Sequence, residues 1–419
     1  MTRRKWLPMW VGALLVALAL GLAACGGSDD EAAPAEPAPA EPAAPAPAEP
    51  AEPAPAEPAP AEPAPAEPAP AESAPAEPAP AESAPAEPAP AESAPAGDNC
   101  SPNQPGPTQD VVPAGDPVEI AFFTVAGNTY LEASTEEMQK VADACGANLT
   151  LIDNGFDPQK QYNNLQDAIT TGKYDAFIVT ALDNAGVVPV IEDAIAAGIK
   201  VVATDTPIGG DFTTTDVQVE GMSGSIIRPA SLLGEDQVAY VLKACEGIDP
   251  CTVVWLPGAL ATVFDQVLKT AFEEMTAANP NIKLIVGPEG GYLADPAFTG
   301  MQDLLQANKK IDVVVTVDQQ ALGAEKAIDD AGRTGEMKII GGGGAEPAVT
   351  AVAEGRWYAT PNFAPRDEGR EAMEMAIIAA RGGTVENPGR FSLDYSEAVR
   401  VVAEDNKAEW EGYTGQWKG

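Results

Sequence analysis

From Val118 onward, short apolar runs alternate with stretches whose apolar residues recur at helical spacing, and this alternation limits the fold more than any other feature. Runs such as Phe177-Ile178-Val179 and Val201-Val202-Ala203 are apolar without interruption, which indicates strands buried on both faces. Strands that alternate with helices form parallel sheets through right-handed crossovers. The sequence therefore predicts an α/β fold with helices on both faces of a parallel sheet.

The alternating pattern occurs twice, which predicts two similar lobes. The first run has strands at 118–125, 149–153, 176–180 and 201–205, with helices at 135–145, 158–171 and 186–197. The second has helices at 233–245, 263–278, 296–308, 321–331 and 347–354, with strands at 252–256, 282–287, 313–317 and 337–341. An irregular stretch near 211–229 separates them, and a helix at 367–380 with late strands completes the lobes.

The N-terminal segment is typical of an export signal. Basic residues at 3–5 precede an apolar run from Trp6 to Leu22, and Leu22-Ala23-Ala24-Cys25 resembles a bacterial lipobox. We therefore expect residues 1–24 to be a lipoprotein signal peptide and Cys25 to carry the lipid. The alternative is an uncleaved anchor, because about 17 apolar residues approach the length that spans a bilayer. Both interpretations place the rest of the chain outside the cytoplasm, in the cell envelope.

Residues 25–98 are predicted to be a disordered Ala/Glu/Pro-rich linker. The repeat Ala-Glu-Pro-Ala-Pro fills most of this segment, and its prolines exclude helix and central strand. An extended polyproline-II chain of this length reaches on the order of 200 Å, so we expect it to hold residues 99–419 away from the membrane.

The composition excludes several classes of site and partner. The chain has no histidine, which excludes Ser-His-Asp and Cys-His catalysis and histidine-containing metal sites. The formal net charge of −39 repels phosphate backbones, so nucleic acid is not an expected partner. We expect no metal and no cofactor.

Apart from Cys25, four cysteines remain, and an even number in an oxidising compartment predicts two disulfides. Cys245 and Cys251 flank a Gly-Ile-Asp-Pro turn and are the expected pair, which leaves Cys100 for Cys145. A zinc site is the alternative, but the chain has no C-x-x-C spacing.

Ligands of open α/β sheets bind beyond the carboxyl ends of the strands, so two facing lobes would form a cleft there. The polar and aromatic residues expected at these ends are Asn128, Tyr130, Thr180, Asp183, Asp205, Thr206, Phe264, Gln266, Tyr292, Asp318 and Gln319, with the run Gly341–Gly344. The glycine run has no lysine or arginine within it, so we interpret it as a tight strand-to-helix turn rather than a phosphate site.

Several segments between about residues 117 and 410 share the order and spacing of a known family. They are 120–130, 157–169, 174–179, 198–205, 301–305, 318–324 and 401–406. Together they resemble the type I periplasmic binding proteins of the ribose- or sugar-binding group. The resemblance implies two lobes joined by a multi-strand hinge, with lobe 1 at about 117–228 and 366–393 and lobe 2 at about 229–365 and 394–419.

The resemblance also implies roles for individual residues. Tyr130 and Tyr292 match positions that stack on a sugar, and Asp205 and Asp318 match carboxylates that bind its hydroxyls. Asn128 lies in the same matched segment as Tyr130, and Thr206 directly follows the segment that ends at Asp205, and both are also expected to bind the ligand. Some positions depart from the family pattern. Gln266 stands where an arginine is usual, and Phe363 stands where a glutamine is usual. Val317 stands where an asparagine is usual, and Gly341–Gly343 stand where Gly-Phe-Asp is common. The predicted clamp is therefore more apolar than is usual in the family.

These features predict a non-enzymatic, lipid-anchored solute-binding protein. It would deliver a sugar or polyol to the permease of an ABC importer, and we expect it to be monomeric. The alternative is a sensory protein that presents a sugar-like signal to a membrane receptor. A secreted glycosidase that uses Asp205 and Asp318 as its carboxylate pair is a further alternative.

Overall fold

The computed structural model describes residues 99–101, 111–125 and 127–419. The predicted signal peptide, the predicted lipidation site at Cys25 and the predicted linker lie outside the described residues. No helix within these ranges is both long enough and apolar enough to cross a bilayer.

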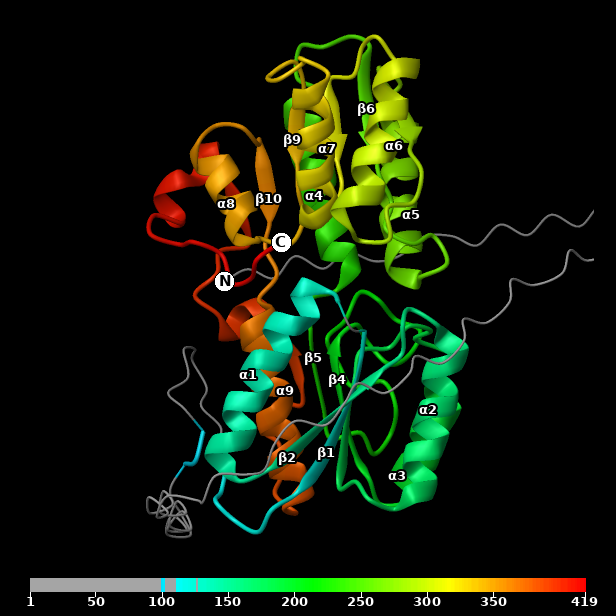
Figure 1. Cartoon of the computed structure of the whole chain (residues 1–419), viewed down its shortest axis with the longest axis vertical. Coiled ribbons are helices and arrows are strands. Elements are labelled where there is room, and N and C mark those ends of the chain that lie inside the picture. Colours follow the sequence, from blue (N-terminus) through cyan, green and yellow to red (C-terminus); the bar gives the residue numbers. More distant parts are fainter. Residues whose placement is uncertain (1–98, 102–110, 126) are drawn as a thin grey trace, which may run out of the picture. The chain divides into compact units, whose positions relative to one another are not determined.

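Within the described residues, twelve strands form two six-stranded sheets of the same topology, one in each lobe (Figure 1). The first sheet has the order β11-β5-β4-β3-β1-β2 and the second has the order β12-β10-β9-β8-β6-β7. Neighbouring strands pair in parallel, except that β12 is antiparallel to β10. The fold is therefore the predicted α/β architecture of two similar lobes, with one antiparallel edge strand in the second.

The first lobe contains β1 (Glu119–Thr124), α1 (Thr129–Cys145), β2 (Asn148–Asp153), α2 (Pro158–Thr171), β3 (Ala176–Val179), α3 (Val188–Ala196), β4 (Lys200–Asp205), β5 (Gly224–Ile227), α9 (Pro365–Ala380), β11 (Gly389–Phe391) and the short 3₁₀ helix η1 (Ser392–Tyr395). The second contains α4 (Ala230–Ala244), β6 (Cys251–Trp255), α5 (Val263–Ala278), β7 (Ile282–Val286), α6 (Ala294–Ala307), β8 (Val313–Val315), α7 (Asp318–Asp330), β9 (Lys338–Ile340), α8 (Glu346–Ala353), β10 (Ala359–Pro361), β12 (Val401–Ala403) and η2 (Glu404–Glu409).

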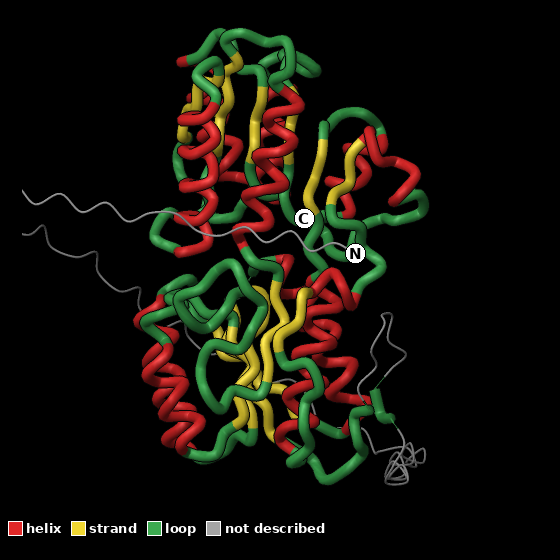
Figure 2. The backbone as a smooth tube through the Cα atoms, turned by 180° about the vertical axis from the view of Figure 1, so that it is seen from behind, coloured by secondary structure: helices red, strands yellow, loops and turns green. Residues whose placement is uncertain are grey.

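The central strands of the first sheet are buried on both faces, and this explains why β3 and most of β1 and β4 are continuously apolar, whereas the edge strand β2 is partly exposed and contains polar residues. Along β1, Ile120 and Phe122 belong to the core formed with α1 and α9, whereas Phe123 belongs to the core formed with α2 and α3. Side chains of a strand point alternately to its two faces, so each strand must supply apolar residues to both cores. Figure 2 shows the helices on both sides of the strands.

The structure corrects the sequence prediction at two elements. The stretch predicted as irregular near 211–229 contains β5, a four-residue strand that pairs with β4 and β11. Helix α1 begins at Thr129 rather than 135, because the side chain of Asn128 accepts hydrogen bonds from the backbone of Tyr130 and Leu131. This cap places Tyr130 in the first turn of the helix.

Three chain segments cross between the lobes, and a network of charged and polar groups ties them together. The segments follow β5, β10 and η1. The guanidinium of Arg228 donates to the Asn362 carbonyl and forms an ion pair with Asp236. Arg400 donates to the same carboxylate at 2.9 Å, and its carbonyl accepts from the Asn362 N–H at 2.9 Å. These contacts fix the three crossings relative to one another.

Candidate functional site

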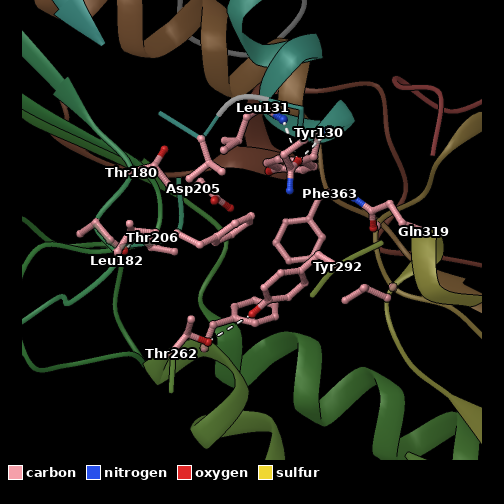
Figure 3. Close-up of a pocket in the computed structure, with 18 of the residues that line it drawn as sticks. Tyr130, Leu131, Thr180, Leu182, Asp205, Thr206, Thr262, Tyr292, Gln319 and Phe363 are labelled. Atoms are coloured by element: carbon pink, nitrogen blue, oxygen red, sulfur yellow. Dashed lines mark hydrogen bonds between the residues drawn. The ribbon is translucent and has the colours of Figure 1, made fainter. Parts of the chain in front are cut away.

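A cavity lies where the carboxyl ends of the strands of the two lobes face each other (Figure 3). The space between its walls measures about 810 Å³, including the part open to solvent. Its lining residues are Val125, Asn128, Tyr130, Leu131, Phe156, Thr180, Ala181, Leu182, Asn184, Asp205, Thr206, Thr262, Phe264, Tyr292, Val317, Gln319, Gly342, Gly343, Phe363 and Trp417.

Aromatic side chains from both lobes form much of the cavity wall. The ring of Tyr130 meets the rings of Phe363 and Trp417 edge to face, with centroids 5.7 Å and 5.6 Å apart. Phe156 of the first lobe stacks on Tyr292 of the second at 5.7 Å. Such rings offer flat apolar surfaces to the apolar faces of a ligand ring.

The hydroxyl groups of the two tyrosines are anchored away from the cavity. The Tyr130 hydroxyl donates to the buried carboxylate of Glu368 on α9. The Tyr292 hydroxyl donates to Asp265 at 2.6 Å, and this carboxylate also accepts from the backbone N–H groups of Gly258 and Ala259. Burial raises the pKa of both tyrosines well above the ordinary value, and the nearby carboxylates raise it further. Each tyrosine hydroxyl therefore stays protonated, and its hydrogen bond holds the ring in place.

Asp205 ends β4 and directs its carboxylate into the cavity (Figure 3). Within the part of the chain that the structure describes, no side chain or backbone group donates to this carboxylate. Burial raises the pKa of Asp205, and it also raises that of Glu368, to which the Asp205 charge contributes. The next residue, Thr206, instead donates its hydroxyl to the Ala181 carbonyl at 2.9 Å.

Unusual backbone conformations concentrate at the cavity. Four non-glycine residues of the described chain have positive φ, and three of them, Phe156 (56°), Asp205 (66°) and Tyr292 (59°), line the cavity. A non-glycine residue in this region costs conformational energy, and such strain is typical of functional sites.

The structure brings six of the eight predicted ligand-binding residues to the cavity wall. They are Asn128, Tyr130, Asp205, Thr206, Tyr292 and Phe363. All six reach the cavity for the same reason. Each lies at or after the carboxyl end of a strand, and these ends face the other lobe. Whether they bind a ligand stays a prediction.

Gln266 and Asp318 are not at the cavity wall, and this corrects the geometry expected for them. Gln266 is exposed on α5, where its amide donates to the Leu260 carbonyl. Asp318 is fully buried, and its carboxylate accepts from the N–H groups of Gly342 and Ala345, both at 2.7 Å, and from the Thr360 hydroxyl at 2.8 Å.

Asp318 instead fixes the glycine-rich turn after β9, from which Gly342 and Gly343 line the cavity. Gly343 has φ 145°, a conformation that favours glycine. Desolvation raises the pKa of Asp318 to about 6 although its hydrogen bonds lower it. The turn therefore serves to shape the wall, in line with its interpretation as a tight turn.

Two prominent lining residues were not predicted. Phe156 follows β2, so the position of strand ends could have identified it. Trp417 lies in the C-terminal tail, is 1% exposed and donates its indole N–H to the Gly343 carbonyl at 3.0 Å. Nothing in the local sequence pattern links this tail to the strand ends.

The structure contains both disulfides that the sequence predicts, Cys100–Cys145 and Cys245–Cys251. The first joins the start of the folded region to the end of α1. Across the described ranges, no group of three or more cysteine, aspartate or glutamate side chains is arranged to hold a metal ion.

Comparison with known proteins decides the family. The model of the periplasmic binding protein domain matches residues 121–384, more than half of the chain. This chain belongs to the periplasmic binding protein domain family. The match spans both lobes and includes most of the cavity wall.

Named relatives within this family are similar over most of their length. The ribose import binding protein of Salmonella typhimurium is 26% identical over 288 residues, which cover 68% of this chain and 92% of the relative. That of Bacillus subtilis is 24% identical, covering 62% and 80%. These relatives are import binding proteins rather than enzymes, and the chain is accordingly a binding protein.

Solved structures show the same fold. An ABC transporter solute-binding protein from Mycobacterium smegmatis, with bound glycerol, is 29% identical with a TM-score of 0.60, covering 72% of this chain and 99% of the other. A galactofuranose-binding protein, 21% identical, also has a TM-score of 0.60.

Proposed function

We propose that this protein is a lipid-anchored, extracytoplasmic solute-binding protein that captures a sugar or sugar-like molecule and delivers it to an ABC importer. The observation that carries the proposal is the cavity between the two lobes. Its wall has aromatic rings from both lobes and one carboxylate, that of Asp205, which accepts no hydrogen bond from any residue that the structure describes. Rings that stack on a sugar and polar groups that meet its hydroxyls are the contacts such a ligand needs.

The family membership supports the same function. The named relatives are import binding proteins for ribose, and a solved relative has glycerol bound. Closure of two lobes around a bound solute is a standard hinge motion, and three crossing segments are present for it here. Cys25 and the Pro-rich linker would place this binding unit at the outer face of the membrane.

A thermal-shift screen of the full-length protein tests the binding role. Sugars, polyols, nucleosides and amino acids would be tested separately. A ligand at 100 times its dissociation constant stabilises the folded state by about 2.7 kcal/mol, which raises the unfolding temperature measurably. We expect stabilisation by at least one sugar or polyol. Stabilisation only by nucleosides or amino acids would contradict the proposed ligand class, and no stabilisation by any compound would contradict the binding role.

Two further experiments separate the finer parts of the proposal. Mass spectrometry of the membrane-extracted protein should find an N-terminal fragment that begins at a diacylglyceryl-modified Cys25; a fragment that still contains Trp6–Leu22 would indicate an uncleaved anchor. Deleting the gene should abolish uptake of the radiolabelled sugar found in the screen. Unchanged uptake, together with a lost transcriptional response to that sugar, would indicate the sensory function instead.

A further inference from the structure

The charged residues of the cavity wall indicate which class of sugar fits the site, which family membership alone does not. Asp205 is the one carboxylate among the lining residues, and none of these described residues is a lysine or an arginine. The buried carboxyl of Glu368 lies close by, bonded to the Tyr130 hydroxyl. The cavity wall therefore has an acidic group and no lysine or arginine to pair with it.

Arg228 is a buried cation next to the cavity wall, but its contacts commit it elsewhere. It pairs with Asp236 and donates to the Asn362 carbonyl. Its guanidinium lies 5.1 Å from the centre of the Phe363 ring, and Arg228 is not among the lining residues. The positive charge of Arg228 therefore acts mainly on Asp236 at the crossing between the lobes and also on Tyr130 and Glu368, and it makes no contribution at Asp205.

Most other polar groups of the wall are already bonded within the protein. The Asn128 carbonyl oxygen caps α1, and the Asn184 amide donates to the Pro207 carbonyl. The Thr206 and Thr262 hydroxyls donate to backbone carbonyls at 2.9 Å and 2.8 Å. By contrast, Asp205 has no donor, and the buried Thr180 hydroxyl, which also lines the cavity, has no partner among the described residues. A ligand that donates hydrogen bonds would complete this part of the wall.

Aromatic rings surround this acidic position. Tyr130, Phe156, Phe264, Tyr292, Phe363 and Trp417 line the same cavity. The faces of aromatic rings attract cations, and an ammonium group near a carboxylate and several rings is favoured by both interactions. A wall of aromatic side chains and one carboxylate also suits a sugar that carries one cationic substituent. The cation can meet the carboxylate, and the apolar faces of the sugar can pack on the aromatic rings.

From this geometry we infer that the cavity binds an amino sugar, a monosaccharide-sized ring whose protonated amino group donates to the carboxylate of Asp205. The inference rests on the proposed sugar-binding function and specifies the class of sugar. The ammonium would supply hydrogen bonds to Asp205 and compensate its charge, and the aromatic rings would pack on the ring faces. The raised pKa values of Asp205 and Glu368 fit an unliganded site that lacks this positive charge.

Calorimetric titration of the full-length protein with matched pairs of sugars tests the inference. D-glucosamine, D-galactosamine and D-mannosamine would each be compared with the parent sugar and with the neutral N-acetyl derivative. We expect at least one amine to bind tenfold or more tightly than both neutral partners. If neutral sugars bind equally well or better, the inference is overturned while the sugar-binding function stands. If none of these compounds binds, this inference fails, and another sugar that binds in the screen would still support the broader function.

Variants locate the charge that is recognised. Asp205→Asn keeps the shape of the side chain, and asparagine tolerates positive φ, so the fold should be retained. It should weaken binding of the amine at least tenfold more than it weakens binding of the neutral parent sugar. Asp303→Asn, on the exposed face of α6 and outside the cavity, makes the same change in net charge and should leave both affinities unchanged. Equal weakening of amine and neutral sugar by Asp205→Asn would contradict the assigned contact.

Choline and spermidine complete the test as cations without a sugar ring. Binding of either as tight as that of the best amino sugar would show that charge alone is recognised, and would overturn the inference of an amino sugar. Binding at least tenfold weaker would support it.

Discussion

At the scale of single residues, the cavity wall is made by side chains that the surrounding structure holds in fixed positions. Tyr292 has a positive φ, and its hydroxyl is bonded to Asp265. Tyr130 lies in the first turn of α1, which Asn128 caps, and its hydroxyl is bonded to Glu368. In both cases the hydroxyl serves to hold the ring, and the ring is the part that faces the cavity.

This division of roles predicts different effects for two substitutions of Tyr292. Tyr292→Phe removes one hydrogen bond to a charged group and should lower the free energy of unfolding by about 1.5–3 kcal/mol. It should change the affinity for a sugar less than threefold. Tyr292→Ala removes the stacking surface and should weaken sugar binding tenfold or more. Urea unfolding and calorimetric titration measure the two effects, and comparable affinity losses in both variants would contradict the role assigned to the ring.

The sequence predicted these residues to the extent that the site follows from topology. Parallel strands place their carboxyl ends at one edge, so Asn128, Tyr130, Asp205 and Tyr292 could be located once the strands were found. The distinction between Asp205 and Asp318 could not be predicted. Both follow strands, but only the three-dimensional path of the glycine-rich turn shows that its N–H groups saturate Asp318.

At the scale of elements, the strands and helices that repeat regularly were predictable, and the irregular segments were not. Helices α2 and α5 have the predicted bounds, because their caps and apolar spacing are local signals. Strand β5 is short, and its place in the sheet depends on pairing with β4 and β11, which are distant from each other in sequence. The C-terminal tail likewise owes its position to contacts with both lobes.

That tail is predicted to be part of the binding site. Gln416 donates to Asp367 on α9 and to Ser396, and Trp417 lines the cavity and bonds to Gly343 in the second lobe. Trp417→Ala should therefore lower the free energy of unfolding by about 3–5 kcal/mol and also weaken sugar binding at least tenfold.

Trp410→Ala is the matched control for this prediction. Trp410 is also buried and donates its indole N–H to a backbone carbonyl, that of Ala403, but it does not line the cavity. Its replacement should lower stability by a similar amount and leave the affinity of the remaining folded protein unchanged. Equal loss of affinity in both variants would show that the Trp417 effect is only a loss of stability.

At the scale of the whole molecule, buried carboxyl groups should make stability depend on pH. Burial raises the pKa of Asp318 to about 6 and that of Asp205 to about 7, from an ordinary value of 3.8. A group with a raised pKa binds its proton more tightly in the folded state, so the unfolding free energy falls as pH rises from the ordinary to the raised value. The unliganded protein should therefore be more stable at pH 5 than at pH 8.

Urea unfolding at a series of pH values measures this dependence. Asp205→Asn removes one titrating group. It should reduce the slope of the unfolding free energy against pH by up to about 1.4 kcal/mol per pH unit. The exposed Asp303→Asn should keep the slope of the unaltered protein, since Asp303 is not buried. An identical slope in all three proteins would contradict the assigned cause, and would leave the repulsion within a chain of net charge −39 as the source of any dependence.

The central claim is that the cavity between the lobes is where a sugar binds. Calorimetric titration of the full-length protein with the sugar found in the screen tests it most directly, in the unaltered protein and in the Tyr130→Ala and Gln266→Ala variants. We predict saturable binding of one sugar per chain, at least tenfold weaker with Tyr130→Ala, which alters the cavity wall, and unchanged with Gln266→Ala, which alters the exposed surface of α5. Binding that Tyr130→Ala leaves unchanged would place the sugar elsewhere and contradict the account.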